Sequence, residues 1–211
     1  MTTILQILVS PRPGSYSRLI AGEVVERLRR RHGGTVVERD LAADPPPHPD
    51  LQFYEAILSG APADDPRFGL SEQLIAELEA AEWVVIGTPM NNFVVPSTLK
   101  AWVDYIVRIR RTFSSTSSGK VGLLCDRPVI VVTSHGGYRG DAPPGQPDFL
   151  TPYLRTIFET IGIADVSFVA LEGLTRGPES LDQALSGARR WIEERLPLTP
   201  PLSAGARSSA A

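Results

Sequence analysis

Three short segments hold most of the side chains in this chain that are able to bind a ligand. Residues 10–18 contribute serine hydroxyls, residues 88–95 contribute two asparagine amides beside apolar side chains, and residues 134–138 contribute a serine, a histidine and paired glycines. Each segment follows a short apolar run that is typical of a buried strand. Hydroxyls, amides and open backbone bind polar ligands through hydrogen bonds, so these residues predict a ligand site.

The first segment is suited to a phosphate group. Ser10, Ser15 and Ser17 surround Gly14 immediately before a predicted helix, where hydroxyls and free backbone amides bind phosphate without a lysine. Ordinary helix capping by the serines is the alternative. The chain has no GxxxxGK[ST] motif, and no GxGxxG motif follows the first strand, so a P-loop and a dinucleotide site are excluded. A phosphomonoester such as that of flavin mononucleotide (FMN) remains.

The second segment offers a polar edge and apolar walls to a planar ring. The amides of Asn91 and Asn92 match the polar edge, and Met90 and Phe93 supply the walls. In an open α/β sheet, ligands bind at the carboxyl ends of the strands, which is where this segment lies. The alternative is a rigid connecting loop in which Phe93 packs into the core.

In the third segment, Gly136 and Gly137 allow backbone to approach a ligand closely, although paired glycines also serve in tight turns. Amides aimed at the pyrimidine edge of a flavin would stabilise the negative charge of its reduced form. His135 has an unperturbed pKa near neutrality and is a candidate proton donor, with a simple hydrogen-bonding role as the alternative. His135 and Asn91 are the only candidates for a catalytic role.

The elements that position these segments alternate between strand and helix. We predict strands at residues 3–9, 35–39, 83–86, 128–133 and 166–171, and helices at 17–31, 51–59, a segment capped by Ser71, 97–107, 149–161 and 179–196. Alternation of this kind predicts a parallel sheet with helices on both faces. Five strands favour the flavodoxin-like order 2-1-3-4-5, in which strands 1, 3 and 4 are neighbours and the three segments converge.

Two further expectations concern residues 97–119. Leu99, Trp102, Val103, Ile106 and Val107 form one apolar helix face, which leaves Lys100, Asp104 and Arg108 on other faces. Residues 111–119 form a polar segment too long for a simple turn, and we interpret it as a surface loop or a functional lid.

Composition limits the class of protein. With 211 residues and 42% hydrophobic content, we predict one domain over residues 1–196 and a disordered tail over 197–211. A net charge of −3 argues against a nucleic-acid partner. The single Cys125 fits a reducing cytoplasm, and three scattered histidines leave no metal site. No signal peptide or bilayer-spanning stretch is present, so we expect a cytoplasmic protein without a membrane partner.

Several motifs together resemble those of the FMN-dependent NADH:quinone oxidoreductases known as azoreductases. They are PMNNF at residues 89–93, PSTLKAWVD at 96–104, RTF at 111–113, SHGG at 134–137 and FLTPYL at 149–154, preceded by the serines of residues 10–17. The similarity runs from about residue 4 to about residue 184. The stretch from PMNNF to the aspartate of PSTLKAWVD is its specific part, because the serines alone are a weak signal.

The resemblance implies a flavodoxin-like fold, one tightly bound FMN per subunit, and a homodimer with active sites at its interface. It also implies which residues contact FMN: Ser10, Ser15, Tyr16, Ser17, Pro89, Met90, Asn91, Asn92, Phe93, Ser134, His135, Gly136 and Gly137. Two positions depart from the commonest family pattern. Asn91 stands where a tyrosine is frequent, and His135 stands where arginine or serine is frequent, so substrate preference and flavin potential are open.

The activity implied is a ping-pong cycle in which NADH or NADPH passes a hydride to FMN N5 and a quinone or azo compound then takes the two electrons. Phe113 and Tyr138 are candidate substrate walls, with core packing as the alternative for each. The rival interpretations are a flavodoxin-type electron carrier and a flavin-based redox sensor, neither of which turns over a substrate. A serine hydrolase is disfavoured because Ser134 and His135 lack a GxSxG elbow.

Overall fold

A five-stranded parallel sheet forms the centre of the computed structural model, which describes residues 2–140 and 145–198. The strands lie in the order β2-β1-β3-β6-β7, and their bounds are β1 Thr3–Leu8, β2 Thr35–Asp40, β3 Trp83–Pro89, β6 Val129–Ser134 and β7 Val166–Leu171. This is the order predicted from the sequence, with β6 and β7 as the fourth and fifth strands of the sheet. Residues 199–211 of the predicted tail lie outside the described residues.

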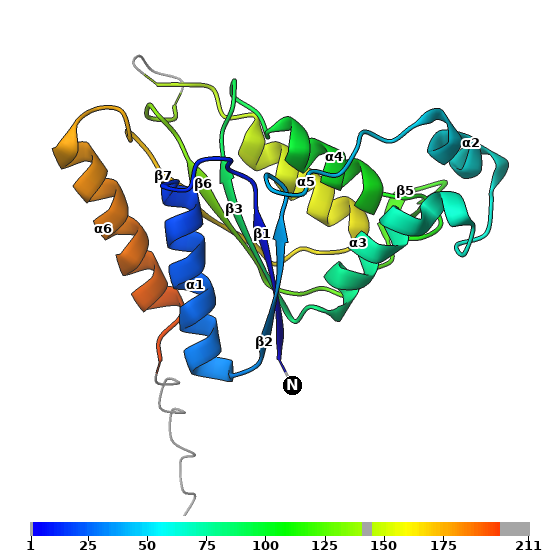
Figure 1. Ribbon diagram of the computed structural model, residues 1–211, viewed down its shortest axis with the longest axis horizontal. Coiled ribbons are helices and arrows are strands. Elements are labelled where there is room, and N and C mark those ends of the chain that lie inside the picture. Colours follow the sequence, from blue (N-terminus) through cyan, green and yellow to red (C-terminus); the bar gives the residue numbers. More distant parts are fainter. Residues whose placement is uncertain (1, 141–144, 199–211) are drawn as a thin grey trace, which may run out of the picture.

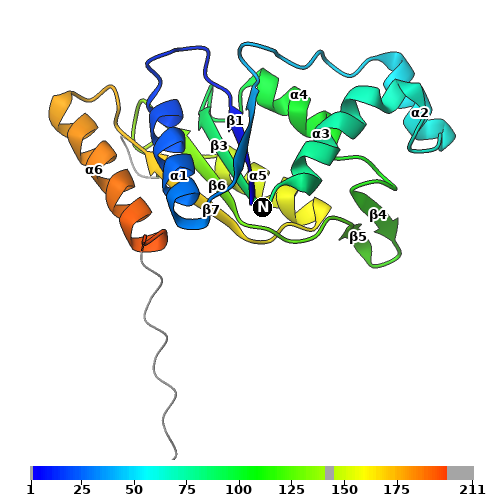
Figure 2. The same cartoon turned by 60° about the horizontal axis from the view of Figure 1, so that its bottom comes forward.

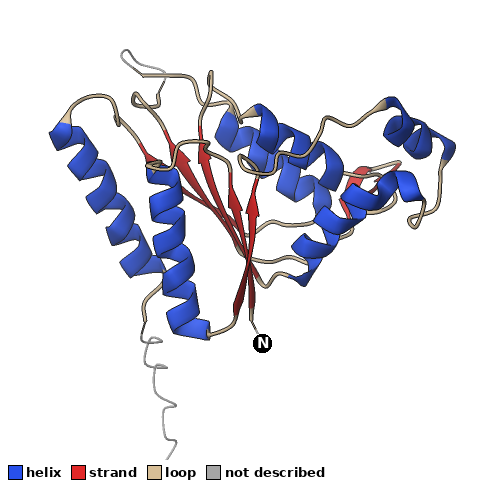
Figure 3. Cartoon of the chain, in the orientation of Figure 1, coloured by secondary structure: helices blue, strands red, loops and turns tan. Residues whose placement is uncertain are grey.

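Helices cover both faces of the sheet (Figures 1 and 3). On one face lie α1 (Tyr16–His32) and α6 (Pro178–Arg195), and on the other lie α3 (Gly69–Ala80), α4 (Ser97–Ile106) and α5 (Leu150–Ile161). The short helix α2 (Leu51–Ser59) and the 3-10 turn η1 (Pro66–Phe68) stand at one end of the molecule. Among the described residues, no helix combines the length and apolar character that a membrane crossing requires.

Alternation along the strands explains the two cores. In β3, Val84 and Ile86 belong to the cluster beneath α3, α4 and α5, whereas Val85 between them packs beneath α1 and α6. Successive side chains of a strand point to opposite faces, so an uninterrupted apolar run serves a strand that is buried on both sides. The same pattern in β1 and β6 makes these the central strands and brings their carboxyl ends together.

The predicted cap at Ser71 is wrong. Helix α3 begins at Gly69, and Ser71 lies inside it with its side chain fully buried. The Ser71 hydroxyl donates to the carbonyl oxygen of Tyr105 at 2.7 Å and accepts from Nη1 of Arg108 at 3.0 Å. A serine near a helix start resembles a cap in sequence, but here a distant partner determines its role.

The interpretation of residues 111–119 as a loop or lid is also wrong. They contain the start of an antiparallel hairpin, β4 (Phe113–Thr116) and β5 (Gly119–Gly122), which stands apart from the main sheet (Figure 2). The Thr116 hydroxyl donates to the carbonyl oxygen of Gly119 at 2.8 Å and pairs with the Ser118 hydroxyl across the tip. Strands of only four residues, of which Phe113 and Val121 are the apolar ones, give no period long enough to be recognised in the sequence.

The prediction that Arg108 lies on another face of the helix is wrong. Helix α4 ends at Ile106, and Arg108 turns into the interior, where only 2% of it is exposed. Its guanidinium lies 4.1 Å from the ring centroid of Phe68 and pairs with Glu72. Burial lowers the pKa of Arg108, while Glu72 acts in the opposite direction. Helical periodicity did not apply here because the helix had already ended.

Candidate functional site

The three predicted segments meet at the carboxyl edge of the sheet. The Val9 amide donates to the Gly87 carbonyl oxygen at 3.0 Å, which joins the end of β1 to β3. The Met90 amide donates to the Ser134 carbonyl oxygen at 2.9 Å, which joins β3 to β6. The loops therefore lie side by side above the ends of these strands (Figure 1). This arrangement follows from the strand order, because parallel strands end at one edge.

The start of α1 is built of buried hydroxyls and unpaired amides. Ser10, Ser15 and Ser17 are all buried, and the Ser15 and Ser17 hydroxyls lie 2.9 Å apart. Ser15 occupies the N-cap position, yet its side chain accepts no backbone amide, so the capping alternative does not hold for it. Within the described residues, the amides of Tyr16, Ser17 and Arg18 have no acceptor. A helix start with free N–H groups carries partial positive charge, which suits a phosphate.

Arg18 fixes this loop, a role that no pattern in the sequence indicated. Its Nε donates to the Ser10 carbonyl oxygen at 2.6 Å, and its Nη2 donates to Asp40 Oδ1 at 2.7 Å at the end of β2. The Arg18 bond, with two backbone amides, holds the pKa of Asp40 below its usual range against the effect of burial. Gly87 matters nearby, because a Cβ there would lie 2.8 Å from the Ser17 carbonyl oxygen. Helix α1 can approach β3 closely only over a glycine.

The second loop is a strained turn. Asn91 and Val94 exchange two backbone hydrogen bonds of 3.0 Å, and the residues between them, Asn92 and Phe93, have φ angles of 47° and 72°. Left-handed backbone at a phenylalanine costs of order 1 kcal/mol, and such strain concentrates at functional sites. Phe93 is 42% exposed, so it is not the core residue of the alternative interpretation. The turn presents its aromatic ring and two amides outward.

The remaining residues of this loop anchor it. Pro89 ends β3 and Met90 packs against the core beneath α4 and α5, both partly buried, whereas Asn91 is exposed. The Phe93 carbonyl oxygen accepts the amide of Phe149 at 3.1 Å, and the Phe149 ring is 57% exposed. Phe149 therefore adds an exposed aromatic ring beside the turn, which the sequence motif named but did not assign to the site.

In the third loop the carbonyls accept hydrogen bonds, and within the described residues the amides of residues 136–138 have no acceptor. The carbonyl oxygens of Gly136 and Gly137 accept backbone amides from residues 173–175, which follow β7. A Cβ at Gly137 would lie 2.9 Å from the end of the Gln146 side chain, which would have to shift. Ser134 ends β6 and is partly buried. The backbone of the loop is thus available on the side opposite its carbonyls.

His135 lies inside the protein and not at the surface of the site. It is 1% exposed, its Nε2 lies 2.8 Å from the Thr133 hydroxyl, and its Nδ1 has no hydrogen-bond partner among the described residues. Burial, with the nearby positive charge of Arg139, lowers the pKa of His135 to about 4. The ring is therefore neutral at neutral pH. This geometry favours the hydrogen-bonding role over the proton-donor role.

The two candidate substrate walls occupy different places. Tyr138 belongs to the third loop, is 41% exposed, and its hydroxyl lies 2.8 Å from that of Ser180. Phe113 is buried at the start of β4 beneath Lys120, in the hairpin that packs against the end of α5 at Gly162. Within one chain, Phe113 is not brought to the three loops.

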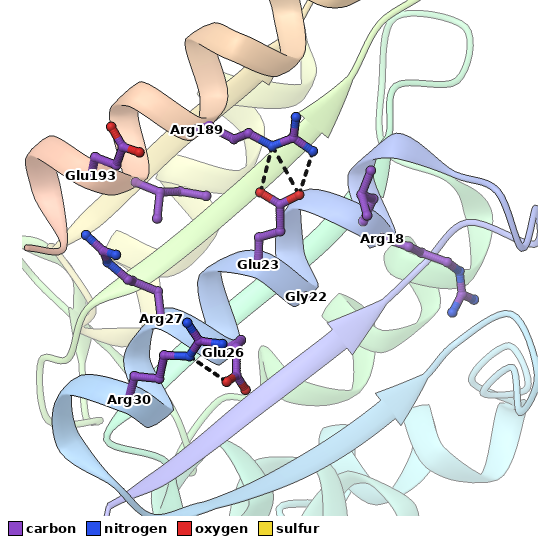
Figure 4. Close-up of a pocket in the computed structure, with 10 residues that line it drawn as sticks. Arg18, Gly22, Glu23, Glu26, Arg27, Arg30, Arg189 and Glu193 are labelled. Carbon is purple, nitrogen blue, oxygen red and sulfur yellow. Dashed lines mark hydrogen bonds and ion pairs between the residues drawn. The ribbon is translucent and has the colours of Figure 1, made fainter. Parts of the chain in front are cut away.

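A large groove in the described structure lies away from the three loops. A groove of about 640 Å³ runs between α1 and α6 and contains none of the predicted contact residues (Figure 4). Its walls carry ion pairs such as Arg189 with Glu23 and Arg30 with Glu26. Paired charges on an open groove do not indicate a specific ligand, so we do not assign the site there. No group of three or more metal-ligating side chains occurs within residues 2–140 and 145–198.

Comparison with known proteins gives consistent results. A family model described as "Flavodoxin-like fold" matches residues 2–196. FMN-dependent NADH:quinone oxidoreductase 2 of Cupriavidus pinatubonensis is 48% identical over 197 residues, covering 90% of this chain and 96% of that protein.

Two crystal structures from Bacillus anthracis share the fold. An azoreductase of the Sterne strain has a TM-score of 0.82 and 22% identity, covering 92% of this chain and 98% of that one, which compares the fold alone. An FMN-dependent NADH-azoreductase of the Ames Ancestor strain, solved in complex with FMN, has a TM-score of 0.77 and 26% identity. That comparison covers 93% of this chain and 100% of the other.

Proposed function

The chain belongs to the family of FMN-dependent NADH:quinone oxidoreductases, and from that premise we propose that it transfers electrons from NADH through FMN to quinones or azo compounds. The observation that carries the proposal is the convergence of the three loops at the carboxyl edge of the sheet. Each loop offers a different part of what FMN requires: a phosphate site, apolar walls and backbone donors.

The residues present fit the phosphate of FMN. The open start of α1 supplies unpaired amides, and the buried hydroxyls of Ser10, Ser15 and Ser17 have capacity for an anionic acceptor. Tyr16 begins the helix beside them and is partly buried. A phosphate oxygen here accepts charge-assisted hydrogen bonds, which are stronger than neutral ones.

The other two loops fit a flat ring system. Met90 and Phe93 offer apolar surface, while the side chains of Asn91 and Asn92 and the open backbone of Gly136 and Gly137 offer polar contacts. We propose that these residues, together with Pro89, Ser134 and His135, hold the ring and its sugar-alcohol chain. The strain at Phe93 is consistent with a turn shaped for a ligand.

FMN, when bound, supplies a ring that accepts a hydride from a reduced nicotinamide and delivers two electrons to a second substrate. The chain's own residues bind and orient: the serines hold the anionic end, and the strained turn and third loop hold the ring in one plane. Positioning of this kind lowers the entropic cost of bringing two reactants together. Exposed Phe93 and Phe149 offer apolar surface for flat quinones or azo compounds, while Tyr138, the other exposed candidate wall, lies against Gly173 and Ser180.

We further propose a homodimer whose interface completes the site. Exposed apolar side chains support this, since Leu51 and Leu58 on α2 are 72% and 85% exposed. Phe113, which lies away from the loops of its own chain, would then serve the partner's site. Sedimentation that finds a fully active monomer would contradict the dimer.

The domain and compartment proposals rest on simpler observations. Residues 1–196 form one FMN-binding domain in this proposal, in keeping with the family match over residues 2–196. The exposed, unpaired Cys125 fits a reducing compartment, and we propose the cytoplasm. Neither proposal affects the chemistry assigned above.

The test begins with the visible spectrum of the purified protein, followed by anaerobic addition of NADH and, in parallel, NADPH. We expect a flavin spectrum that bleaches with the reduced nicotinamide and returns when a quinone is added. A flavin that is bound but not bleached would favour the electron carrier or the sensor. Protein that is colourless and does not take up added FMN would contradict the proposed site.

A further inference from the structure

Residues 173–175, which follow β7, form a backbone support behind the third loop. Three consecutive carbonyl oxygens of that loop accept three consecutive amides of the support. The bonds run from Gly173 to Gly137, from Leu174 to His135 and from Thr175 to Gly136, at 3.0, 3.1 and 3.1 Å. The Thr175 hydroxyl adds a second bond to the Gly136 carbonyl oxygen at 2.8 Å. This segment therefore sets the orientation of three successive peptide groups.

The orientation of these three peptide groups also determines where their N–H groups point. In a planar trans peptide, the N–H points away from the C=O of the same unit. Because the carbonyls face residues 173–175, the amides of Gly136, Gly137 and Tyr138 face the opposite way. Across the described ranges, none of these three amides donates a hydrogen bond. They are available to a ligand, and their direction depends on the support behind them.

Arg139 fastens the support to the loop. Its backbone amide donates to Glu172 Oε2 at 2.9 Å and its Nε donates to Glu172 Oε1 at 2.8 Å. Its Nη1 donates to Asp148 Oδ2 at 2.8 Å, just before α5, and reaches the Thr151 hydroxyl at 3.3 Å. Arg139 directly follows the loop and Glu172 directly precedes the support, so one guanidinium joins three segments at the carboxyl edge.

These ion pairs are partly shielded from water. The side chains of Arg139, Asp148 and Glu172 are between 17% and 27% exposed. Burial alone would raise the pKa of each carboxyl group, but the Arg139 and Thr151 bonds to Asp148 and the Arg139 bonds to Glu172 hold both values below their usual range. The Arg139 guanidinium donates one hydrogen bond to each of two carboxylates, and its planar set of donors restricts their orientation more than a lysine would.

We propose that Arg139 is a positioning residue for FMN: through Glu172 and Asp148 it holds residues 173–175 against the third loop and so aims the amides of Gly136, Gly137 and Tyr138 at the bound ring. The proposal rests on the proposed function. Donors aimed at the ring favour its electron-rich form, so Arg139 influences the flavin reduction potential as well as FMN affinity. Arg139 itself need not contact FMN.

The test compares Arg139→Met with Arg139→Lys, which keeps the charge but not the fork of donors. For each protein, the FMN dissociation constant is measured by flavin fluorescence on the apoprotein, and the midpoint potential of bound FMN by spectroelectrochemistry. We expect Arg139→Met to weaken FMN binding about tenfold and to make the potential more negative. Arg139→Lys should recover most of both changes.

Arg189→Met is the matched control. Arg189 makes an equally close ion pair, with two hydrogen bonds of 2.8 and 3.1 Å to Glu23, but it does so across α1 and α6, away from the third loop. It should lose a similar ion pair while keeping FMN affinity and potential. Equal effects of Arg139→Met and Arg189→Met would overturn the proposal, because they would indicate only general loss of stability.

If Arg139→Met does not fold, Thr175→Val provides a second test of whether residues 173–175 orient the third loop for FMN. It removes one hydroxyl bond to the Gly136 carbonyl and keeps the shape of the side chain, so we expect about threefold weaker FMN binding at unchanged melting temperature. Unchanged affinity and potential in this variant would overturn the proposal. If the unaltered protein binds no FMN, the proposed function fails first. If it binds FMN and both variants match it, only the positioning role fails.

Discussion

Two helix ends in this protein are treated in opposite ways. At the carboxyl end of α3, the buried guanidinium of Arg127 donates to the carbonyl oxygens of Leu78, Glu79 and Ala81 and to that of Cys125. At the amino end of α1, the first amides keep no partner within the described residues, and Ser15 does not cap them. Both ends carry orphan backbone groups, and only one is satisfied from within the chain.

We interpret the closed end of α3 as stabilising the fold and the open end of α1 as a place for a ligand. Unsatisfied polar groups in a partly buried place are costly unless water or a ligand binds them. The saturated end of α3 lies just before β3 begins, at the edge of the sheet opposite the three loops, whereas the open end of α1 belongs to the proposed FMN site. The following four predictions test this contrast, in order of decreasing expected effect.

Removing the guanidinium at the saturated end should cost the most stability. Arg127→Met leaves several buried carbonyls without donors, so we expect the free energy of unfolding to fall by about 4 kcal/mol. Urea denaturation measures this loss. Arg30→Met, which breaks only the exposed pair with Glu26, should change stability by less than about 0.5 kcal/mol. A loss below about 1 kcal/mol for Arg127→Met would contradict the view that Arg127 stabilises the fold by binding the carbonyls at the end of α3.

His135 should make the protein sensitive to mild acid. Its pKa in the folded protein, about 4, lies below the ordinary value of 6.5, so the unfolded chain takes up a proton first as the pH falls. The stability that depends on neutral His135 is fully present above pH 6.5 and is lost as the pH falls from 6.5 towards 4. From about 1.4 kcal/mol per pKa unit, we expect a loss of about 3 kcal/mol over that range.

His135→Gln, which does not titrate there, should lack this portion of the acid sensitivity. Chemical denaturation of both proteins at several pH values between 4 and 7 measures it. Parallel curves for the two proteins would show that the buried histidine does not titrate as its surroundings indicate.

Removing hydroxyls at the open end should reduce FMN binding and leave folding nearly unchanged. In the double variant Ser15→Ala with Ser17→Ala, both partners of one mutual hydrogen bond are lost together, which is close to neutral for stability. Loss of two bonds to a phosphate should weaken FMN binding about 100-fold, or about 2.7 kcal/mol. Titration of apoprotein with FMN tests this prediction. A large drop in melting temperature with unchanged FMN affinity would mean that the two hydroxyls stabilise the fold and do not bind FMN.

The strained turn should show the smallest effect. Phe93→Gly relieves the left-handed backbone at φ 72°, and after the extra flexibility of glycine in the unfolded chain we expect a gain of about 0.5 kcal/mol. Val94→Gly is the matched control, because Val94 is equally exposed but is not among the left-handed residues, so it should lose stability. Thermal denaturation compares them, and equal losses in both variants would mean that the turn stores no strain.

The sequence was sufficient for the features that depend on local periodicity. The residue ranges of α2 and β7 were predicted as the structure has them, and the strand order followed from alternation and apolar runs. The three loops were found for the same reason: a strand end, a glycine and a helix start are local signals, and parallel strands bring their ends to one edge. Family motifs added the identity of the ligand, which periodicity does not contain.

Only the tertiary structure decided which polar groups have partners. Ser71 was taken for a cap although its partner is Tyr105, Arg108 was placed outside although it pairs with Glu72, and Arg139 was not noticed although it joins three segments. These contacts link residues tens of positions apart, and the same arginine or serine in sequence suits either a surface or a buried role. Hydrophobic burial is encoded in a repeating pattern, whereas each polar partnership is a single long-range contact that no local pattern specifies.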